Sequence, residues 1–354
     1  MKRKFYKIHK WCGVIAAFFI LLMGLTGAIL VFHNEIQAFE HRNLWIVKNN
    51  QPVSIDKAYQ TLTLLYPNRI LRLIRFSEHP KETLIFSLNY NDQRSLAFMH
   101  PSNGSVLKVV SSNSTWVNWI LDFHSSFQAG KPGKVIVFIV GWIFFISLIT
   151  GTVFYGNNIY KILLFKTPFK YHSKRALSSS LHKYVSVWAL LLNFILVVTG
   201  ILISFDNIDH HSPSISINQP IKFSLDSALN LLHKRYPQYT PTYVRYPTDI
   251  SKPLIINGKV KGQAFYWTQY YNEVKIHLTT GEMSSLRLTS EANAKTKLAS
   301  IVGVLHLVEF ESVLVKLLFC FAGLSAPLLS ISGFFMWKAR VVNRSCISSI
   351  KTAV

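Results

Sequence analysis

Residues 9–30 read HKWCGVIAAFFILLMGLTGAIL, and residues 182–202 read HKYVSVWALLLNFILVVTGIL. Each stretch begins with His-Lys and an aromatic residue, continues through an apolar run and ends near a Thr-Gly pair. Four stretches of the chain lack any Asp, Glu, Lys or Arg, namely residues 11–34, 135–160, 184–205 and 317–337. An apolar helix of about 20 residues crosses the roughly 30 Å of hydrocarbon in a bilayer. The sequence therefore predicts four transmembrane helices and disfavours the buried core helices of a large soluble protein.

The formal net charge of +22 is distributed unevenly along the chain. Residues 1–10, the linker 161–183 and the tail 338–354 carry basic residues and no acid. Because basic segments at a membrane edge mark the cytoplasmic side, both termini and the linker are expected there. The loops at about 34–134 and 206–305 are then expected outside. We expect the basic residues to set the orientation of the chain in the membrane and to contact anionic membrane lipid. No nucleic-acid partner is expected.

The chain repeats itself. The first apolar run matches the third. The second also matches the fourth: His124 precedes the second run and Thr150-Gly151 ends it, as His306 precedes the fourth and Ser332-Gly333 ends it. The two halves are expected to be related by an axis along the membrane normal. Two explanations stay open for the Thr-Gly and Ser-Gly pairs: close packing of helix backbones, or space for a flat cofactor between helices.

Both outer loops show the pattern of a small α+β domain. In the first, Ser54 is expected to cap a helix through Leu65, before strands at 70–76, 84–88 and 95–99. In the second, Ser224 is expected to cap a helix through His233, before strands near 243–246, 254–256, 263–269 and 273–278. Each loop is therefore predicted to place one helix on its own short antiparallel sheet.

A family resemblance follows from these motifs. The helix that opens Ser54-Ile55-Asp56-Lys57-Ala58, with its strands and an Asn-Gly or Thr-Gly turn, resembles a PepSY domain. The His-Lys-Trp start of the first span, its Leu-Thr-Gly end and the Phe-His-Asn-Glu that follows resemble PepSY-associated transmembrane proteins of bacterial inner membranes. The resemblance covers nearly the whole chain. It implies a membrane α-helical fold of four transmembrane helices in two repeats, with two α+β PepSY-like periplasmic domains.

The expected order combines these predictions. It is a cytoplasmic N-terminus (1–10), a first span (11–34), a periplasmic domain (35–114), an interfacial helix (115–127), a second span (134–156), a cytoplasmic linker (157–181), a third span (182–205), a second periplasmic domain (206–295), an interfacial helix (296–311), a fourth span (312–337) and a cytoplasmic tail (338–354).

Five histidines lie at the predicted membrane ends, namely His9, His33, His124, His182 and His306. Histidines at such depth are costly to hold and are candidates for function. His9 and His33 flank one helix and stand about 36 Å apart, so they cannot share a ligand. The repeat pairs His9 with His182 at the cytoplasmic face and His124 with His306 at the outer face, with His33 as the substitute in the outer pair.

Two neutral imidazoles are a known axial ligand set for haem iron. The family resemblance includes iron-regulated membrane proteins and ferrisiderophore reductases that carry haem b. The two pairs are therefore predicted to bind two haem b groups, non-covalently because the chain has no C-x-x-C-H motif. The alternative for any one histidine is an interfacial residue in the head-group layer. The remaining histidines, namely His41, His79, His100, His172, His210, His211, His233 and His277, are expected mostly to be solvated.

No Gly-rich nucleotide fingerprint, phosphate loop or nucleophile elbow is present, and no catalytic residue is assigned. Electrons are expected from quinol or a cytoplasmic partner that docks on the basic linker. The favoured hypothesis is a haem-b inner-membrane reductase, which passes electrons to a periplasmic ferric chelate such as a ferrisiderophore and releases Fe(II). Four aromatic residues of the second loop would line the chelate site or fill the sheet core, namely Tyr266, Trp267, Tyr270 and Tyr271.

Two other functions remain open. One is a non-enzymatic, membrane-anchored PepSY binding or regulatory protein, which would hold no chromophore. The other is a transporter. This function is the less favoured, because a transporter needs charged residues at mid-membrane and the apolar runs have none.

Overall fold

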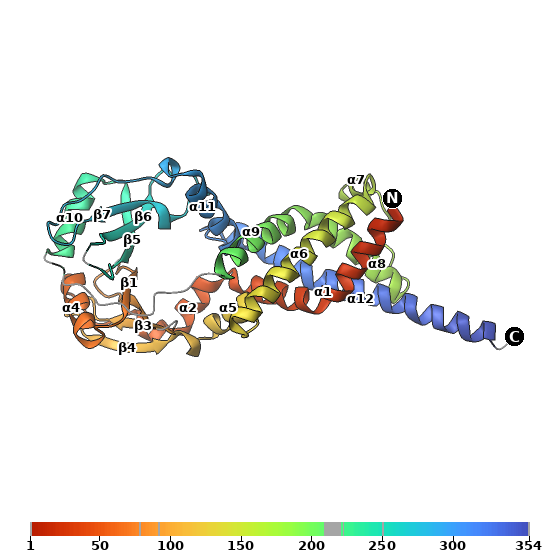
Figure 1. Cartoon of the computed structure of the whole chain (residues 1–354), viewed down its shortest axis with the longest axis horizontal. Helices are drawn as coiled ribbons and strands as arrows, with labels where there is room; N and C mark the ends of the chain where they lie inside the picture. Colours follow the sequence, from red (N-terminus) through yellow and green to blue (C-terminus); the bar gives the residue numbers. More distant parts are fainter. Residues whose placement is uncertain are drawn as a thin grey trace. The chain divides into compact units, whose positions relative to one another are not determined.

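The computed structural model describes residues 2–77, 79–90, 93–208, 221, 223–249 and 251–352, with side chains between residues 3 and 341. Two compact units are present. The membrane unit comprises Met1–His33, Ile120–Asp209 and Leu305–Val354, and the sheet unit comprises Asn34–Trp119 and His210–Val304. Both units take residues from each half of the chain (Figure 1).

Four helices of the membrane unit are long and apolar enough to cross a membrane. They are α1 (Lys2–Leu30), α6 (Gly130–Tyr155), α9 (Leu190–Ile208) and α12 (Val313–Thr352). Their candidate spans are Arg3–Leu30, Gly130–Tyr155, Leu190–Ile208 and Val313–Val341. The chain is thus a membrane protein, in agreement with the four predicted spans.

The third apolar run is divided between two helices. α8 (Lys174–Trp188) ends before Ala189, and α9 begins directly after it. Ala189 keeps helical torsion angles of φ −91° and ψ 0°, and its N–H donates to the carbonyl of Val185 at 3.0 Å. The interruption is therefore confined to one residue. Among the described residues, α7 (Asn158–Leu163) precedes α8 in the linker.

The membrane helices pack as neighbours in a defined order. α1 contacts α6 and α12, α6 contacts α9, and α8 contacts α12. Helices α1 and α12 approach closely at Gly24 of α1, where an added Cβ would lie 2.5 Å from Pro327 Cδ and 2.7 Å from the Gly323 carbonyl oxygen. Gly24 therefore lets α1 and α12 approach closely, as small residues do between membrane helices.

The sheet unit contains seven strands and several short helices. Its helices are α2 (His33–Glu40), α3 (Arg42–Trp45), α4 (Ile55–Leu65) and α10 (Leu225–Arg235), and its 3₁₀ turns are Ser112–Ser114, Gln269–Tyr271 and Thr289–Glu291. Its strands are β1 (Ile70–Arg75), β2 (Leu84–Tyr90), β3 (Gln93–Met99), β4 (Val106–Ser111), β5 (Tyr239–Arg245), β6 (Leu254–Val260) and β7 (Glu273–Ile276). Two helices lead towards the membrane spans, α5 (Trp116–Ser126) before α6 and α11 (Ala294–Leu307) before α12.

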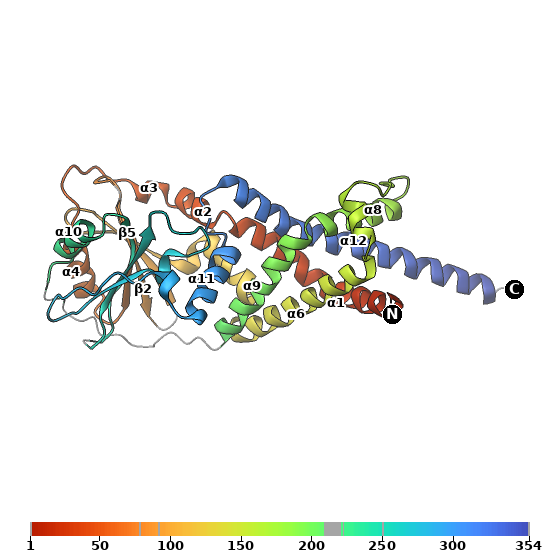
Figure 2. The same cartoon turned by 90° about the horizontal axis from the view of Figure 1, so that it is seen from above.

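The strands form one continuous antiparallel sheet in the order β4-β3-β2-β1-β5-β6-β7 (Figures 1 and 2). Strand β1 of the first loop pairs with β5 of the second, through Arg72 opposite Arg245 and Leu73 opposite Val244. The prediction of a separate sheet in each loop is therefore wrong. The physical reason is that β1 and β5 would otherwise each be an edge strand with unpaired N–H and C=O groups. Pairing β1 with β5 gives these backbone groups hydrogen-bond partners.

The predicted strand at 263–269 is also absent. This segment forms turns that lead into the 3₁₀ turn Gln269–Tyr271. Side chains take the place of a neighbouring strand: Asn272 bonds to the Gly258 carbonyl and to Gln263, and Ser300 accepts the N–H of Thr268 at 2.8 Å. Such side-chain bonds compete with sheet pairing.

Helices α4 and α10 cover one face of the sheet and enclose its core with residues such as Leu62, Leu73, Phe86, Leu232 and Val244. Ser54 and Ser224 cap these helices as predicted. The caps are joined reciprocally. The Asp56 carboxylate accepts from the N–H of Leu225 at 2.7 Å, and the Asp226 carboxylate accepts from the N–H of Ile55 at 2.8 Å. Each acid therefore stabilises the positive end of the other helix.

Candidate functional site

Four of the predicted histidines meet in two pairs inside the membrane unit. The rings of His9 in α1 and His182 in α8 have centroids 6.1 Å apart, with an angle of 78° between planes. The rings of His124 in α5 and His306 in α11 have centroids 6.4 Å apart, with an angle of 42°. Each pair takes one histidine from each half of the chain. His33 is placed at the first residue of α2 and is half-buried.

The pair near α5 and α11 is oriented by threonine hydroxyls. Nδ1 of His124 lies 2.9 Å from Thr26 Oγ1, and Nδ1 of His306 lies 3.1 Å from Thr199 Oγ1. Each hydroxyl donates its own hydrogen to a helix carbonyl four residues earlier, at 2.8 and 2.7 Å. Because that hydrogen is committed, the hydroxyl accepts and Nδ1 donates. The assigned tautomer therefore leaves the lone pair on Nε2.

The pair near the chain's N-terminus is oriented in the same way with different partners. Nδ1 of His182 lies 3.0 Å from Ser332 Oγ, which donates to a helix carbonyl at 2.7 Å. Nδ1 of His9 lies 2.9 Å from the backbone carbonyl of Ser147, which only accepts. Nδ1 is thus the donor in all four rings. Metal-ligating histidines are held in this manner by their second nitrogen.

Each imidazole ring lies against the glycine of a Thr-Gly or Ser-Gly pair. An added Cβ would come within 2.9 Å of His306 at Gly200, 3.1 Å of His124 at Gly27, 3.1 Å of His9 at Gly151 and 3.5 Å of His182 at Gly333. The space that these glycines leave is therefore taken by a histidine ring. The hydroxyl neighbour bonds Nδ1 in three of the four cases, and Thr150 instead donates to the carbonyls of Ile146 and Ser147.

This arrangement was missed in the sequence, although a signal for it is present. Four histidines at the predicted membrane ends accompany four hydroxyl-glycine pairs in the spans. Each histidine contacts the pair on a span of its own half of the chain, as His9 does with Gly151 and His124 does with Gly27. The equal number of both features is the pattern that would have connected them.

The two pairs lie near opposite ends of the bundle. Helix α1 carries His9 of one pair and also Thr26-Gly27, which contacts His124 of the other pair. The 17 residues between His9 and Thr26 correspond to about 26 Å along a helix. The pairs are therefore two separate sites, each with two imidazole donors.

The donor set fits axially ligated haem. Two imidazole nitrogens that bind one iron from opposite sides at about 2.0 Å place their ring centroids about 6.2 Å apart. The observed centroid distances are 6.1 and 6.4 Å. The part of the chain that the structure describes holds no group of three or more His, Cys, Asp or Glu side chains able to bind a metal. Two imidazoles would suffice for a six-coordinate haem, because its porphyrin supplies the other four ligands.

Most of the other histidines are solvated, and His41 is the exception. His79, His172, His233 and His277 are exposed, and His100 is half-buried. His41 is only 8% exposed and packs against Phe98 at 5.3 Å, so its predicted solvation is wrong. Its position between α2 and α3, next to the sheet, explains the burial. His210 and His211 lie outside the described residues.

The four aromatic residues of the second loop do not join the core beneath α4 and α10. Tyr266 is 37% exposed and contacts Trp267 at 4.9 Å between ring centroids. Tyr270 packs edge-on against Tyr243 of β5 at 5.6 Å. These rings therefore belong to the other face of the sheet and its flanking loop.

Comparison with known protein families identifies the family of the chain. The family model described as PepSY-associated TM region matches residues 6–340, which include all four paired histidines. A comparison with curated proteins finds no match to the chain. Since the match extends over nearly the whole length, the chain belongs to the family of PepSY-associated transmembrane proteins.

Proposed function

We propose that the protein is a haem-b reductase of the bacterial inner membrane that passes electrons outward to a ferric chelate, such as a ferrisiderophore, and releases Fe(II). The observation that carries the proposal is the presence of two histidine pairs about 26 Å apart along α1, each with Nδ1 committed as a donor. A non-enzymatic membrane-anchored PepSY protein would have no need of two such pairs.

In this proposal the chain is a doubled helix–domain–helix unit. Both termini and the basic linker face the cytoplasm, and the sheet unit, made of two PepSY-like halves, faces the periplasm. The equivalent placement of His9 with His182, and of His124 with His306, supports this duplication. So do the reciprocal bonds of Asp56 and Asp226.

The residues of the chain position the cofactor. His9 and His182 would hold one haem b, and His124 and His306 the other, through Nε2. Bound haem supplies one-electron transfer. The hydroxyls and carbonyls that accept from Nδ1 keep each ring in one orientation and raise the basicity of the ligand nitrogen. Two centres divide the thickness of the membrane into shorter distances than one centre would.

Electrons would enter from the cytoplasmic side. The linker and the start of α8 line a cavity of about 510 Å³ with the basic residues Lys170, Arg175 and Lys183. This surface supports docking of a quinol or of an acidic partner protein. On the outer side, reduction to Fe(II) weakens the hold of hard oxygen donors and frees the metal.

The test is an absorption spectrum of the purified, detergent-solubilised protein before and after dithionite. We expect b-type Soret and α bands with two haems per chain. His124→Ala should remove one haem, whereas His233→Ala, at an exposed position, should remove none. Absence of the bands after haem-supplemented expression, in protein that remains monodisperse, would favour the non-enzymatic PepSY protein and overturn the proposal.

A further inference from the structure

Three arginines lie together on the face of the sheet that α4 and α10 leave uncovered. Leu71 and Leu73 of β1 point into the core, so Arg72 between them projects from the opposite face. Arg245 of β5 is paired directly with Arg72. Arg94 of β3 reaches the same face, where its Nε donates to Ser87 Oγ at 3.1 Å. We call Arg72, Arg94 and Arg245 the arginine cluster.

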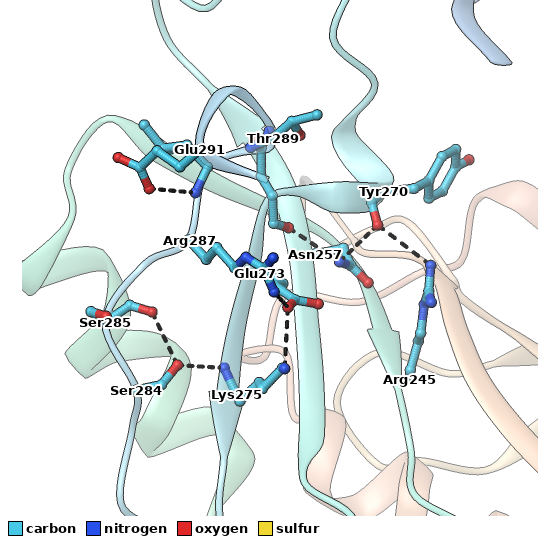
Figure 3. A network of polar contacts seen from close by, with 12 residues as sticks. Arg245, Asn257, Tyr270, Glu273, Lys275, Ser284, Ser285, Arg287, Thr289 and Glu291 are labelled. Atoms are coloured by element: carbon cyan, nitrogen blue, oxygen red, sulfur yellow. Dashed lines mark hydrogen bonds and ion pairs between the residues drawn. The ribbon is translucent and has the colours of Figure 1, made fainter. Parts of the chain in front are cut away.

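The arginine cluster has only neutral partners. Arg72 Nη1 donates to Tyr243 Oη at 3.5 Å, and Arg245 Nη2 donates to the Tyr270 carbonyl at 3.4 Å (Figure 3). Among the described residues no carboxylate lies within ion-pair distance of the three guanidinium groups. Arg245 Nε is buried and has no hydrogen-bond partner in the described part of the chain.

Glu273, an acid of the same sheet, already pairs with two other bases. Glu273 of β7 lies 3.3 Å from Lys275 Nζ and 3.6 Å from an Arg287 nitrogen (Figure 3). Its charge is therefore shared by two other bases. Like charges directly opposite each other on neighbouring strands destabilise a sheet, and the pairing of Arg72 with Arg245 incurs this cost with no acid to offset it. An anion bound here would relieve it.

Two tyrosine rings lie beside the same charges, and further aromatic rings follow in the neighbouring loop. Tyr243 and Tyr270 pack edge-to-face at 5.6 Å, and the Arg245 guanidinium lies 5.7 Å from the Tyr243 ring. In the adjoining loop Phe265 is 75% exposed and contacts Tyr266 at 5.4 Å. The surface thus combines unpaired cations with flat apolar groups, which suits a ligand that is both anionic and aromatic.

We propose that the arginine cluster binds an anionic ferric chelate of the catecholate class. The inference rests on the proposed function, whose substrate class it specifies. Guanidinium groups bind oxygen anions through paired N–H donors, and the catechol rings would lie against Tyr243, Tyr270 and Phe265. A cationic hydroxamate chelate would be repelled by the three positive charges.

Gallium(III) chelates test this assignment, because gallium(III) matches the charge and size of Fe(III) but is not reduced. Isothermal titration calorimetry on the full-length protein in detergent should show saturable binding of gallium(III) tris-catecholate and none of a cationic gallium(III) hydroxamate chelate. Arg72→Gln and Arg245→Gln should each weaken binding about tenfold or more, since each removes a charge-assisted contact. Raised salt should also weaken binding.

Arg69→Gln is the matched control. Arg69 is in the same unit and its guanidinium lies 5.2 Å from the centre of the Tyr66 ring, outside the three cluster positions, so binding should stay unchanged. If Arg245→Gln lowers the thermal stability, Arg94→Gln, at an exposed position, replaces it. Equal binding in the wild type and the cluster variants, absence of binding in the wild type, or equally tight binding of metal-free catechol would each overturn the assignment.

The result is separable from that of the proposed function, because binding of a gallium chelate needs neither haem nor electrons. Dithionite bands without chelate binding would overturn only the catecholate assignment. Arginine-dependent chelate binding without haem bands would overturn only the reductase.

Discussion

The glycine next to each histidine ring gives a graded prediction, which is sharpest for Gly200→Ala. An alanine Cβ at this position would lie 2.9 Å from His306 Cε1, whereas ordinary contact begins at 3.4 Å. The ring must then move by about 0.5 Å, the difference of these distances. An off-rotamer side chain costs about 0.5–1.5 kcal/mol, and loss of the Thr199 hydrogen bond costs a similar amount. Replacing a helical glycine by alanine stabilises the helix by up to about 1 kcal/mol, which offsets part of these costs.

We therefore expect Gly200→Ala to destabilise the membrane unit by about 1 kcal/mol. Gly333→Ala is the internal control, since its Cβ would meet His182 at 3.5 Å, an ordinary contact. In Gly333→Ala only the stabilisation from replacing a helical glycine by alanine should remain. Thermal unfolding of both variants in detergent, with and without haem, measures the difference in their stability. The midpoint potential of the haem proposed between His124 and His306 should shift only in Gly200→Ala. Equal melting temperatures for the two variants would refute the reasoning.

Three further predictions concern other contacts. Asp56→Ala removes the acceptor for the first turn of α10 and should lower the free energy of unfolding of the sheet unit by about 1–2 kcal/mol. Asp226→Ala should have the same effect at α4. Chemical denaturation measures both changes, and an unchanged free energy would contradict the reciprocal caps. Burial lowers the pKa of His41, so the unfolded chain binds a proton near pH 6.5 that the folded chain does not, and stability should fall as the pH drops below about 6.5. His41→Leu should flatten that fall between pH 7.5 and 5.5 in thermal scans, and an unchanged slope would exclude His41 as its source. Thr26→Val removes the acceptor for Nδ1 of His124 and should lower haem affinity about 10–100-fold, measured by haem titration. Thr61→Val in α4 of the sheet unit, where the hydroxyl donates to the Lys57 carbonyl at 3.0 Å, is the inactive control.

The membrane helices were predictable because hydrocarbon thickness imposes a length and a composition that few other structures share. The helix caps at Ser54 and Ser224 were also readable, since a hydroxyl before an amphipathic run satisfies the first free N–H groups. The single sheet was not readable. Strand β1 has the same alternation whether it lies at an edge or beside β5, so a period of two does not identify its neighbour. The segment 263–269 resembled a strand because aromatic residues are common in strands, yet Asn272 supplies its bonds.

The histidine pairs were predictable from the repeated sequence motifs, because each pair joins matching positions of the two halves of the chain. Their orientation was not. A hydroxyl in a membrane helix bonds a carbonyl four residues earlier whether or not a histidine is near, so the sequence around Thr26 and Thr199 does not indicate a second partner. The arginine cluster was hidden for a different reason, since its three members come from three strands, two of which pair only in the folded sheet.

The reciprocal bonds of Asp56 and Asp226 have an evolutionary consequence. Each acid contacts the other's helix, which is the pattern of an isologous interface between two identical subunits. On the proposed duplication, an ancestral half-length protein would have formed the same bonds twice as a homodimer, with one histidine of each pair from each copy. Fusion of two such genes would then have allowed the halves to diverge. The first half now contributes four strands and the second three, so the sheet is asymmetric, and the proposed chelate would meet one half of it differently from the other.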